Sequence, residues 1–470
     1  IFPIPLGQAA SWCSETVKQC ARISALEAAT VGVNWTFAPM IDISRDPRWG
    51  RIAESLGEDP HLCSVLGVAM VEGFQGDALH KDGNIAACAK HFAGYGAGES
   101  GRDYSTVNIP ENELRNVYLP PFKAVADAGV ATFMSAFNDL NGVPASGNKW
   151  LMTDILRQEW NYPGFVVSDW ESIQQLTTHG FSKDNKDAAY EAANAGIDME
   201  MVSTTYLDHL PDLLVQGHIS IQQVDTAVTK ILQLKWQLGL FDSPYTDASM
   251  LTVPLNPEHL QIAKDAAIKS CVLLKNENNI LPLSAESLHS IAIIGPLADD
   301  PYEQLGTWIF DGDSQYSQTC LQAIEQLLLG QVSIKHVKAM QTSRSYNQAD
   351  FKQAVDSASA ADVAVLILGE ESILSGEAHC RAEIGLPGCQ EQLIDAIAQT
   401  GTPIVLVIMA GRPLTIEDIL PKVDAVLFAW HPGTMGGPAI ADLLFGKAYP
   451  SGKLPVTFSR KVGPVPIYYA

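Results

Sequence analysis

The sequence predicts an α/β fold in two parts, an irregular or incomplete (β/α) TIM-barrel-like domain followed by an α/β sandwich domain. Three observations support this prediction. The chain has 470 residues, and single cores stop growing at roughly 250 to 300. Apolar strand-like runs alternate with segments of helical period, as in parallel βα units. A stretch rich in Pro, Asp and Ser interrupts both periods near the middle of the chain.

The first domain is expected over residues 1–237. Segments of helical period, such as 111–129, separate strand-like runs at 33–41, 85–93, 130–138, 164–170 and 197–201. Five such runs are fewer than the eight strands of a closed barrel. We therefore expect the barrel to be irregular or incomplete.

A linker is expected over residues 238–262, with its clearest part at 239–259, and a second domain over 263–470. The second domain shows helical segments at 390–399 and 437–445. Its strand-like runs lie near 271–276, 290–298, 332–340, 362–370, 404–411 and 425–433. A sandwich built on about six strands fits this pattern.

Composition and charge exclude several classes of function. The chain carries 30 Lys and Arg against 53 Asp and Glu, a formal net charge of −23 that repels phosphate backbones and anionic lipid surfaces. Its longest apolar runs are about half as long as a membrane-spanning helix. The eight cysteines show no CxxC spacing, so they are predicted to be mostly buried thiols. Nucleic acid and a membrane span are therefore not expected.

The sharpest candidate site lies at the end of the run 164–170, where an apolar strand delivers Asp169 and Trp170. The carboxyl ends of parallel strands are where a βα barrel keeps its chemistry, and His91 and Asn138 also follow apolar runs. The alternative is that Asp169 only caps a helix.

Lys90 and His91 form a second candidate, followed by a Gly-rich loop. Together they can donate several hydrogen bonds to sugar hydroxyls. A core histidine and a surface lysine are the alternatives. A metal site is less favoured because no second His or Cys lies at ligand spacing around His91.

Two further clusters are rich in charge. Residues 42–60 alternate arginines with acids, and a salt-bridged loop is the simplest interpretation for Arg45 and Arg48. Only one arginine of this segment need face a ligand, and the segment itself does not say which. In the second domain, the loop immediately after the strand expected at 363–368 carries several carboxylates, and chemistry alone does not distinguish among them: Glu370, Glu371, Glu377 and Glu383.

Taken together, these segments resemble glycoside hydrolase family 3 from Ile1 to Ala470 in unbroken order. The resemblance rests on eight motifs in register: FPIPLGQAASW, APMIDISRDPRWGRIAESLGEDP, KHFAGYGAGESGRDYSTVNI, MSAFNDLNGVPASGN, GFVVSDW, GLFDSPY, GEAHCRAEIGLPG and SGKLPVTF. No single motif is specific, but their combination is.

The resemblance implies a βα barrel joined to an α/β sandwich, an active site in the cleft between them, and no metal or organic cofactor. It implies a retaining β-glucosidase that acts on β-linked oligosaccharides or aryl and alkyl β-glucosides, with Asp169 as nucleophile and Glu377 as acid/base. The sugar-binding residues that it implies are Arg51, Lys90, His91, Arg102, Met134, Trp170 and Trp308.

Several alternatives stay open within this resemblance. The activity could be that of a β-xylosidase or a dual glucosidase and xylosidase, or the chain could be a catalytically silent sugar-binding fragment. A β-N-acetylglucosaminidase is disfavoured because no further His lies between Phe92 and Thr178. Family members usually carry a first strand and a Gly-x-Asp-x-x-His-Gly element before the first residue seen here, and many continue beyond Ala470 into a fibronectin-like domain, so the chain is expected to be truncated at both ends. The family leans towards a periplasmic or secreted location, and the protein is expected to be a monomer or homodimer.

Overall fold

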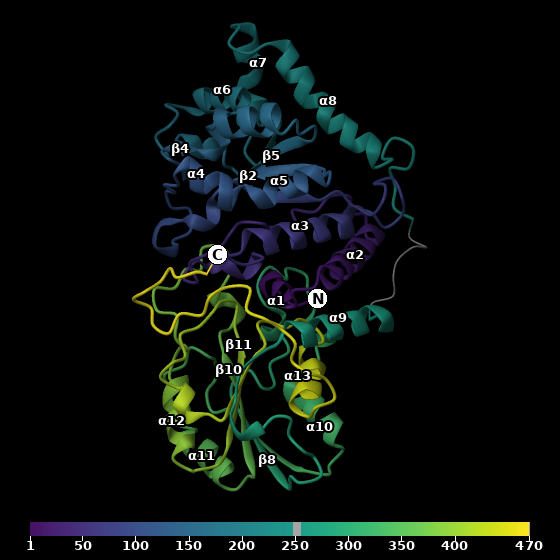
Figure 1. Ribbon diagram of the computed structural model, residues 1–470. Helices are drawn as coiled ribbons and strands as arrows, with labels where there is room; N and C mark the ends of the chain where they lie inside the picture. The colour runs from purple at the N-terminus through teal and green to yellow at the C-terminus, as the bar shows by residue number, and fades with distance from the viewer. Residues whose placement is uncertain (248–254, 470) are drawn as a thin grey trace. The chain divides into compact units, whose positions relative to one another are not determined.

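The computed structural model describes residues 1–247 and 255–469 (Figure 1). The chain divides into two compact units. Unit 1 comprises Ile1–Thr16, Ser44–Glu58 and Pro254–Ala470, and unit 2 comprises Val17–Ile43 and Asp59–Val253. Part of the expected linker, residues 248–254, lies outside the described residues.

Unit 1 is built on a six-stranded sheet with the order β7-β12-β11-β10-β8-β9. All neighbours are parallel except β7 and β12. Its strands are β7 (Val272–Asn276), β8 (Ser290–Ile294), β9 (Ser333–Val337), β10 (Val363–Gly369), β11 (Ile404–Met409) and β12 (Ala425–Phe428). The central strands β10 and β11 are buried along their whole length, as their continuous apolar runs require. The six predicted strands are confirmed.

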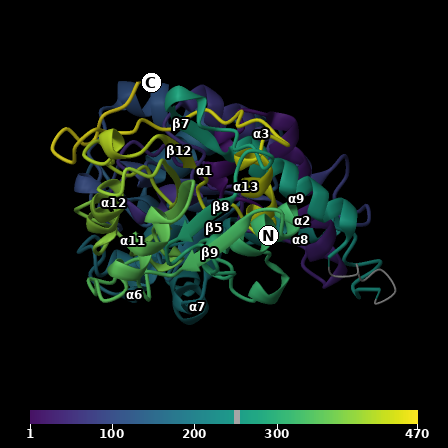
Figure 2. The same cartoon turned by 90° about the horizontal axis from the view of Figure 1, so that it is seen from below.

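Helices cover both faces of this sheet. In Figures 1 and 2, α11 and α12 lie on one side of the strands and α13 lies on the other. The helices of unit 1 are α1 (Pro5–Ala10), α9 (Pro257–Ser270), α10 (Cys320–Leu328), α11 (Phe351–Ser359), α12 (Gln390–Ala398) and α13 (Gly436–Leu444). Its short helical turns are η1 (Gly50–Glu54), η9 (Glu277–Asn279), η10 (Glu303–Leu305), η11 (Ser314–Tyr316), η12 (Ser372–Leu374) and η13 (Leu420–Lys422). The predicted α/β sandwich therefore has three layers.

Unit 2 contains a four-stranded parallel sheet with the order β1-β2-β5-β6. Its strands are β1 (Cys88–Phe92), β2 (Thr132–Ser135), β5 (Phe165–Trp170) and β6 (Met199–Met201), and a small hairpin is formed by β3 (Asp139–Leu140) and β4 (Val143–Pro144). Within the described residues the sheet does not close into a barrel. This agrees with the predicted incomplete barrel.

Helices accompany the strands of unit 2. Those that lie wholly or mostly in it are α2 (Ser14–Thr30), α3 (Pro60–Gln75), α4 (Glu111–Glu113), η4 (Leu114–Tyr118), α5 (Pro120–Asp127), η6 (Trp150–Glu159), α6 (Asn185–Ala195), α7 (Thr205–Val215) and α8 (Ile221–Gln237). Short turns are η2 (Tyr95–Ala97), η3 (Glu99–Gly101), η5 (Ala145–Gly147) and η7 (Gln174–Leu176).

Two predicted elements of unit 2 are less regular than expected. The run 33–41 follows β1 through isolated bridges, Trp35 to Ala86 and Met40 to Lys90, and forms no regular strand. Pro39 within the run has no N–H to donate to a ladder. The single helix predicted over 111–129 is wrong in its continuity, because it is divided into α4, the π-helical turn η4 and α5. The interruption falls at the Pro-Pro pair that opens α5, since neither proline can donate.

In the described part of the chain, no helix has the length and apolarity needed to cross a membrane.

Candidate functional site

Asp169 lies at the carboxyl end of β5, in unit 2. The four residues before it are buried, and the strand runs parallel between β2, which pairs with it as far as Val167, and β6, which pairs with it at Val167 and Trp170. Its Oδ1 atom accepts a hydrogen bond of 2.7 Å from the N–H of Trp170. The carboxylate is largely buried yet sits at the edge of the sheet where ligands of parallel folds bind. Asp169 caps no helix, because it belongs to a strand.

His91, in β1, connects Asp169 to a second carboxylate. Its Nδ1 atom is 2.8 Å from Oδ2 of Asp42, which also accepts the main-chain N–H of His91 at 3.0 Å. On the other side of the ring, Nε2 is 3.5 Å from Oδ2 of Asp169. A carboxylate so close to Nδ1 keeps a proton on that nitrogen and fixes the ring orientation. The arrangement therefore holds the imidazole edge towards Asp169.

Glu377 lies in unit 1, in the loop between β10 and α12, with Arg51 as its neighbour. The NH1 atom of Arg51 is 3.6 Å from Oε2 of Glu377. Arg51 is buried in η1 and also forms a two-point contact with Glu54, through Nε at 2.8 Å and NH2 at 3.1 Å. The guanidinium is thus held in one plane by Glu54 while one of its nitrogens faces Glu377.

The backbone around Glu377 is unusual. Gly376 has φ +100° and Ala378 has φ +61°, so left-handed residues lie on both sides of the carboxylate. The N–H of Gly376 donates to the carbonyl of Gly50 at 2.8 Å. A left-handed conformation at a residue with a Cβ is strained and persists only where its surroundings enforce it. The conformation of the loop is therefore imposed by its contacts within unit 1.

The structure separates the four carboxylates that the sequence left undistinguished. Glu370 is fully buried between Arg381 and Arg412. The pKa of Glu371 is raised by burial but lowered overall by hydrogen bonds from Arg344 and Ser343, which keep it ionised. Glu383 is exposed. Glu377 is the member of the four that lies beside Arg51 and remains partly exposed.

Two family models match most of the chain. Residues 1–234 match the glycosyl hydrolase family 3 N-terminal domain, and residues 271–470 match the C-terminal domain of the same family. The chain belongs to glycosyl hydrolase family 3. The family resemblance seen in the sequence and the predicted fold class are both confirmed.

Three relatives illustrate how far the similarity extends. A periplasmic beta-glucosidase of Salmonella typhimurium is 40% identical over the whole of this family 3 chain, which spans 64% of that protein. A beta-xylosidase of Formosa agariphila is 36% identical over the whole chain, which spans 67% of it. The crystal structure of a beta-glucosidase from Listeria innocua in complex with glucose has a TM-score of 0.96 and 40% identity over the whole chain, and the chain spans 64% of that structure.

The other predicted site residues of unit 2 differ in their surroundings. Lys90 is half-buried in β1. Trp170 is 57% exposed at the end of β5, where an aromatic ring is available to a ligand. Met134 is buried in the apolar cluster that includes Phe165. Arg102 is exposed, and its Nε donates to the carbonyl of Glu99 at 3.4 Å.

The interpretation of a salt-bridged loop for the segment 42–60 is confirmed for Arg48, whereas the Arg45 guanidinium contacts an aromatic ring. Arg48 binds Asp46 at 2.6 Å, and this hydrogen bond raises the pKa of Arg48. The guanidinium of Arg45 lies 3.9 Å from the ring centre of Tyr468. Arg51 is therefore the arginine of this segment that lies beside the candidate acid/base.

Trp308, also in unit 1, has φ +60° and is 45% exposed. Its ring lies 5.2 Å from that of Phe310. The pair presents aromatic surface rather than filling a core.

The prediction of mostly buried thiols is confirmed for six of the eight cysteines, with Cys13 half-buried and Cys380 exposed. Burial raises the pKa of both Cys88 and Cys271 to about 12, so neither thiol is ionised at neutral pH. The described residues contain no group of three or more His, Cys, Asp or Glu side chains placed to hold a metal ion.

Two residues with central positions were missed at the level of the sequence. Asp42 orients His91, and Arg412 binds Glu370. Each directly follows an apolar run that had been recognised as strand-like, 33–41 and 404–411. The rule that singled out Asp169, a polar residue at the end of a strand-like run, would have found both.

Proposed function

We infer that the protein is a retaining, exo-acting β-glucosidase that removes terminal non-reducing β-D-glucosyl residues. The observation that carries this inference is the buried Asp169 at the end of β5, with its Oδ2 atom 3.5 Å from an imidazole nitrogen that is itself oriented by Asp42. Family membership and the 40% identity to beta-glucosidases support the same activity.

In the proposed mechanism Asp169 attacks the anomeric carbon while protonated Glu377 donates a proton to the leaving oxygen. A covalent glycosyl-enzyme forms on Asp169. Water then attacks it, and Glu377 takes the proton of that water, so the β configuration is retained. The reaction uses two carboxyl groups and requires no metal or organic cofactor.

Hydrogen-bond donors around the glycone would come from Lys90, His91 and Arg51. His91 suits this role because Asp42 fixes its ring. We assign the exposed rings of Trp170 and Trp308 to stacking on sugar faces, since each has free aromatic surface. We propose that Arg102 and Met134 also line the sugar-binding site.

β-Xylosidase activity is the second candidate. It is favoured by the 36% identity to a beta-xylosidase over the whole chain. The two glycones differ by one hydroxymethyl group, and a hydrophobic or steric contact to such a group discriminates by only about 1–3 kcal/mol. A location outside the cytoplasm is proposed as well, because one relative is periplasmic.

The proposal is tested by hydrolysis of matched aryl β-D-glucosides and aryl β-D-xylosides, followed by trapping with a 2-deoxy-2-fluoro-β-glucoside that bears a good leaving group. We expect a higher kcat/KM for the glucoside and a stable adduct that mass spectrometry locates on Asp169. The first-formed product, followed by NMR, should be the β anomer.

Each contrary result has a meaning. A higher kcat/KM for the xyloside, with the adduct still on Asp169, would make xylose the preferred glycone and leave the proposed mechanism unchanged. An adduct on another residue, or an α-anomeric product, overturns the mechanism. Sugar binding without any turnover makes the chain a silent sugar-binding fragment.

A further inference from the structure

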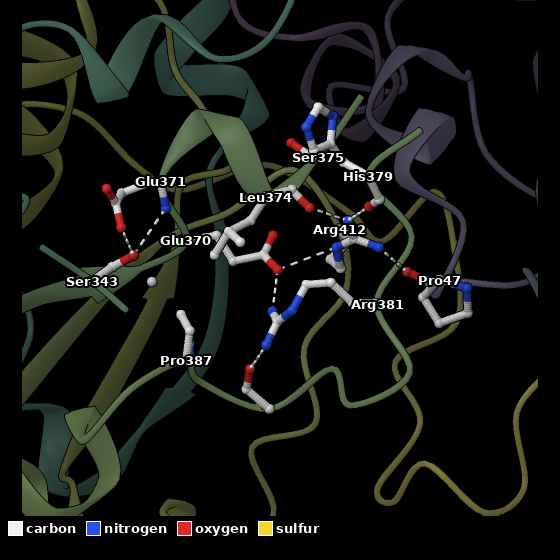
Figure 3. Close-up of polar contacts among 12 residues, drawn as sticks. Pro47, Ser343, Glu370, Glu371, Leu374, Ser375, His379, Arg381, Pro387 and Arg412 are labelled. Carbon is white, nitrogen blue, oxygen red and sulfur yellow. Dashed lines mark hydrogen bonds and ion pairs between the residues drawn. The ribbon is translucent and has the colours of Figure 1, made fainter. Parts of the chain in front are cut away.

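Arg412 lies beside the loop that carries Glu377, at the carboxyl end of the unit 1 sheet. It follows β11 by three residues, and Glu370 directly follows β10, the neighbouring parallel strand. Arg412 is fully buried, and its Nε atom is 3.2 Å from Oε1 of Glu370 (Figure 3). A buried guanidinium requires partners for all of its N–H groups.

The NH1 and NH2 atoms of Arg412 bind main-chain carbonyls of two separate segments. NH1 donates to Pro47 at 2.9 Å and to Arg48 at 3.0 Å. NH2 donates to His379 at 2.9 Å and also to Leu374. One planar group therefore binds residues 374 and 379, on both sides of Glu377 in the sequence, and residues 47 and 48, which precede Arg51. Figure 3 shows Leu374, His379 and Pro47 around the Arg412 guanidinium.

The same two segments are joined directly by their backbones. The N–H of Gly376 donates to Gly50 at 2.8 Å, and the N–H of Arg381 donates to Arg48 at 3.0 Å. The contact leaves no space for a side chain. A Cβ at Gly50 would lie 2.2 Å from the carbonyl oxygen of Gly376, and one at Gly411 would lie 2.1 Å from Oγ of Ser375.

The charges of this region are centred on Glu370. Its carboxylate contacts both Arg381 and Arg412, and Arg381 continues to the carbonyl of Gly385 at 3.1 Å. Arg381, four residues after Glu377, thus connects the loop to the Glu370 carboxylate, which Arg412 also contacts. Removal of the Arg412 side chain would leave Glu370 its contact with Arg381 but would release the four carbonyls.

We propose that Arg412 is a positioning residue that sets where the Glu377 carboxylate stands relative to Arg51, and so governs proton donation to the leaving group. This inference rests on the proposed function. Arg412 touches neither substrate nor Glu377 in this proposal. It acts through residues 374–379 and 47–48, which it binds at the same time.

The test compares the parent chain with Arg412→Lys, which keeps the charge but lacks the planar set of donors. The control is Arg344→Lys, which alters another arginine–glutamate pair, with the carboxylate of Glu371, and the contacts of the Arg344 guanidinium do not include residues 374–379. Aryl β-glucosides that span good and poor leaving groups are the substrates. Acid catalysis matters only for poor leaving groups.

We expect Arg412→Lys to lower kcat/KM by roughly 10²-fold for a poor leaving group and by less than about threefold for a dinitrophenyl glucoside. Arg344→Lys should leave both values near those of the parent. A uniform loss for all leaving groups in Arg412→Lys overturns the proposal, because it indicates a smaller folded fraction.

Hydrogen exchange supplies a readout that does not depend on activity. The amide protons of Gly376 and Arg381 should exchange at least about tenfold faster in Arg412→Lys, while those of β10 and β11 keep their rates. Unchanged exchange at Gly376 and Arg381 overturns the proposal. A parent chain that cleaves no glycoside refutes the proposed function, and the exchange rates still decide whether Arg412 holds the loop.

Gly50→Ala serves where Arg412→Lys does not fold. It pushes on the carbonyls of Gly376 and His379 without removing a buried charge. The same split between good and poor leaving groups is expected, and equal losses for both would count against the inference.

Discussion

Asp169 and Glu377 are held in place by different means. Asp169 belongs to β5, whose ladder with β2 holds the strand as far as Val167 and whose pairing with β6 resumes at Trp170. Glu377 lies eight residues beyond the end of β10, between two left-handed residues, and its loop is held by Arg412 and by the segment 47–50. A strand end thus positions one carboxylate, and a set of hydrogen bonds to loop carbonyls positions the other.

This difference has a consequence for tolerance to substitution. Strand positions are fixed by a ladder of backbone hydrogen bonds that a distant side chain hardly affects. A loop held by one buried guanidinium loses several contacts at once when that side chain changes. We therefore expect the function of Glu377 to depend on more residues outside the site than the function of Asp169.

The largest effect is expected for Asp169→Gly. Removal of the proposed nucleophile should lower kcat by roughly 10⁴-fold or more, for good and poor leaving groups alike, because no covalent intermediate can form. Steady-state hydrolysis of dinitrophenyl and phenyl β-glucosides provides the measurement. Appreciable turnover of either substrate by a correctly folded variant would place the nucleophile elsewhere.

Glu377→Ala should have a smaller and more selective effect. A general acid contributes about 10² to 10⁴-fold, so hydrolysis of phenyl β-glucoside should fall by that factor. Dinitrophenyl glucoside should still form the glycosyl-enzyme, and added azide should restore turnover by attacking it. If azide has no effect while the variant remains folded, the acid/base is a different residue.

The difference between a strand end and a loop also decides how far Asp169 and Glu377 could be predicted from the sequence. The apolar run 164–167 made Asp169 a candidate by pattern, because a strand end is a local property of the sequence, although its role as nucleophile came from the family resemblance. Glu377 could be chosen among four acids only by resemblance to a family, since its distinction lies in contacts with residues 47–51, more than 300 positions away. The six strands of unit 1 were predicted for the same local reason, whereas the interruptions at 33–41 and 111–129 depended on prolines within otherwise regular runs.

Asp42→Asn tests whether Asp42 orients His91 beside Asp169 in unit 2. Asn keeps the shape of the side chain but is neutral, so the single oxygen that accepts from both Nδ1 and the main-chain N–H of His91 becomes an amide oxygen, which is a weaker acceptor than a carboxylate. We expect kcat/KM to fall by roughly 10²-fold at most, the scale of a displaced binding group. Asp82→Asn, an exposed position in the same unit, is the matched control for loss of charge.

A role of Asp42 in orienting His91 should appear equally for good and poor leaving groups, because the glycone is common to both. A loss confined to poor leaving groups would instead link Asp42 to proton donation. The residues around Asp169 and those around Glu377 would then not differ in the step that they support. Unchanged kinetics would mean that His91 keeps its orientation through other contacts.

The smallest effect is expected for a substitution of His431, which contacts the main chain of Glu370 in unit 1. Its Nε2 atom is 3.1 Å from the carbonyl of Glu370, and burial lowers its pKa, with Arg412 adding to the decrease and Glu370 opposing it. In the unfolded chain His431 has the ordinary histidine pKa of about 6.5, and in the folded chain its pKa is lower. The unfolded chain therefore binds the proton more readily than the folded chain. This contribution to stability is complete above about pH 6.5 and is lost as the pH falls below it.

His431→Gln removes this titration while it keeps a donor for the Glu370 carbonyl. Between pH 7.5 and 5.5, Tm measured by calorimetry should fall less in His431→Gln than in the parent, whereas the exposed control His80→Gln should follow the parent. Other buried groups, such as Glu303, titrate in all three proteins and cancel in the difference. Parallel Tm profiles for His431→Gln and the parent would show that the region around Glu370 accepts a proton at no cost, and the close packing that holds the Glu377 loop would then need another explanation.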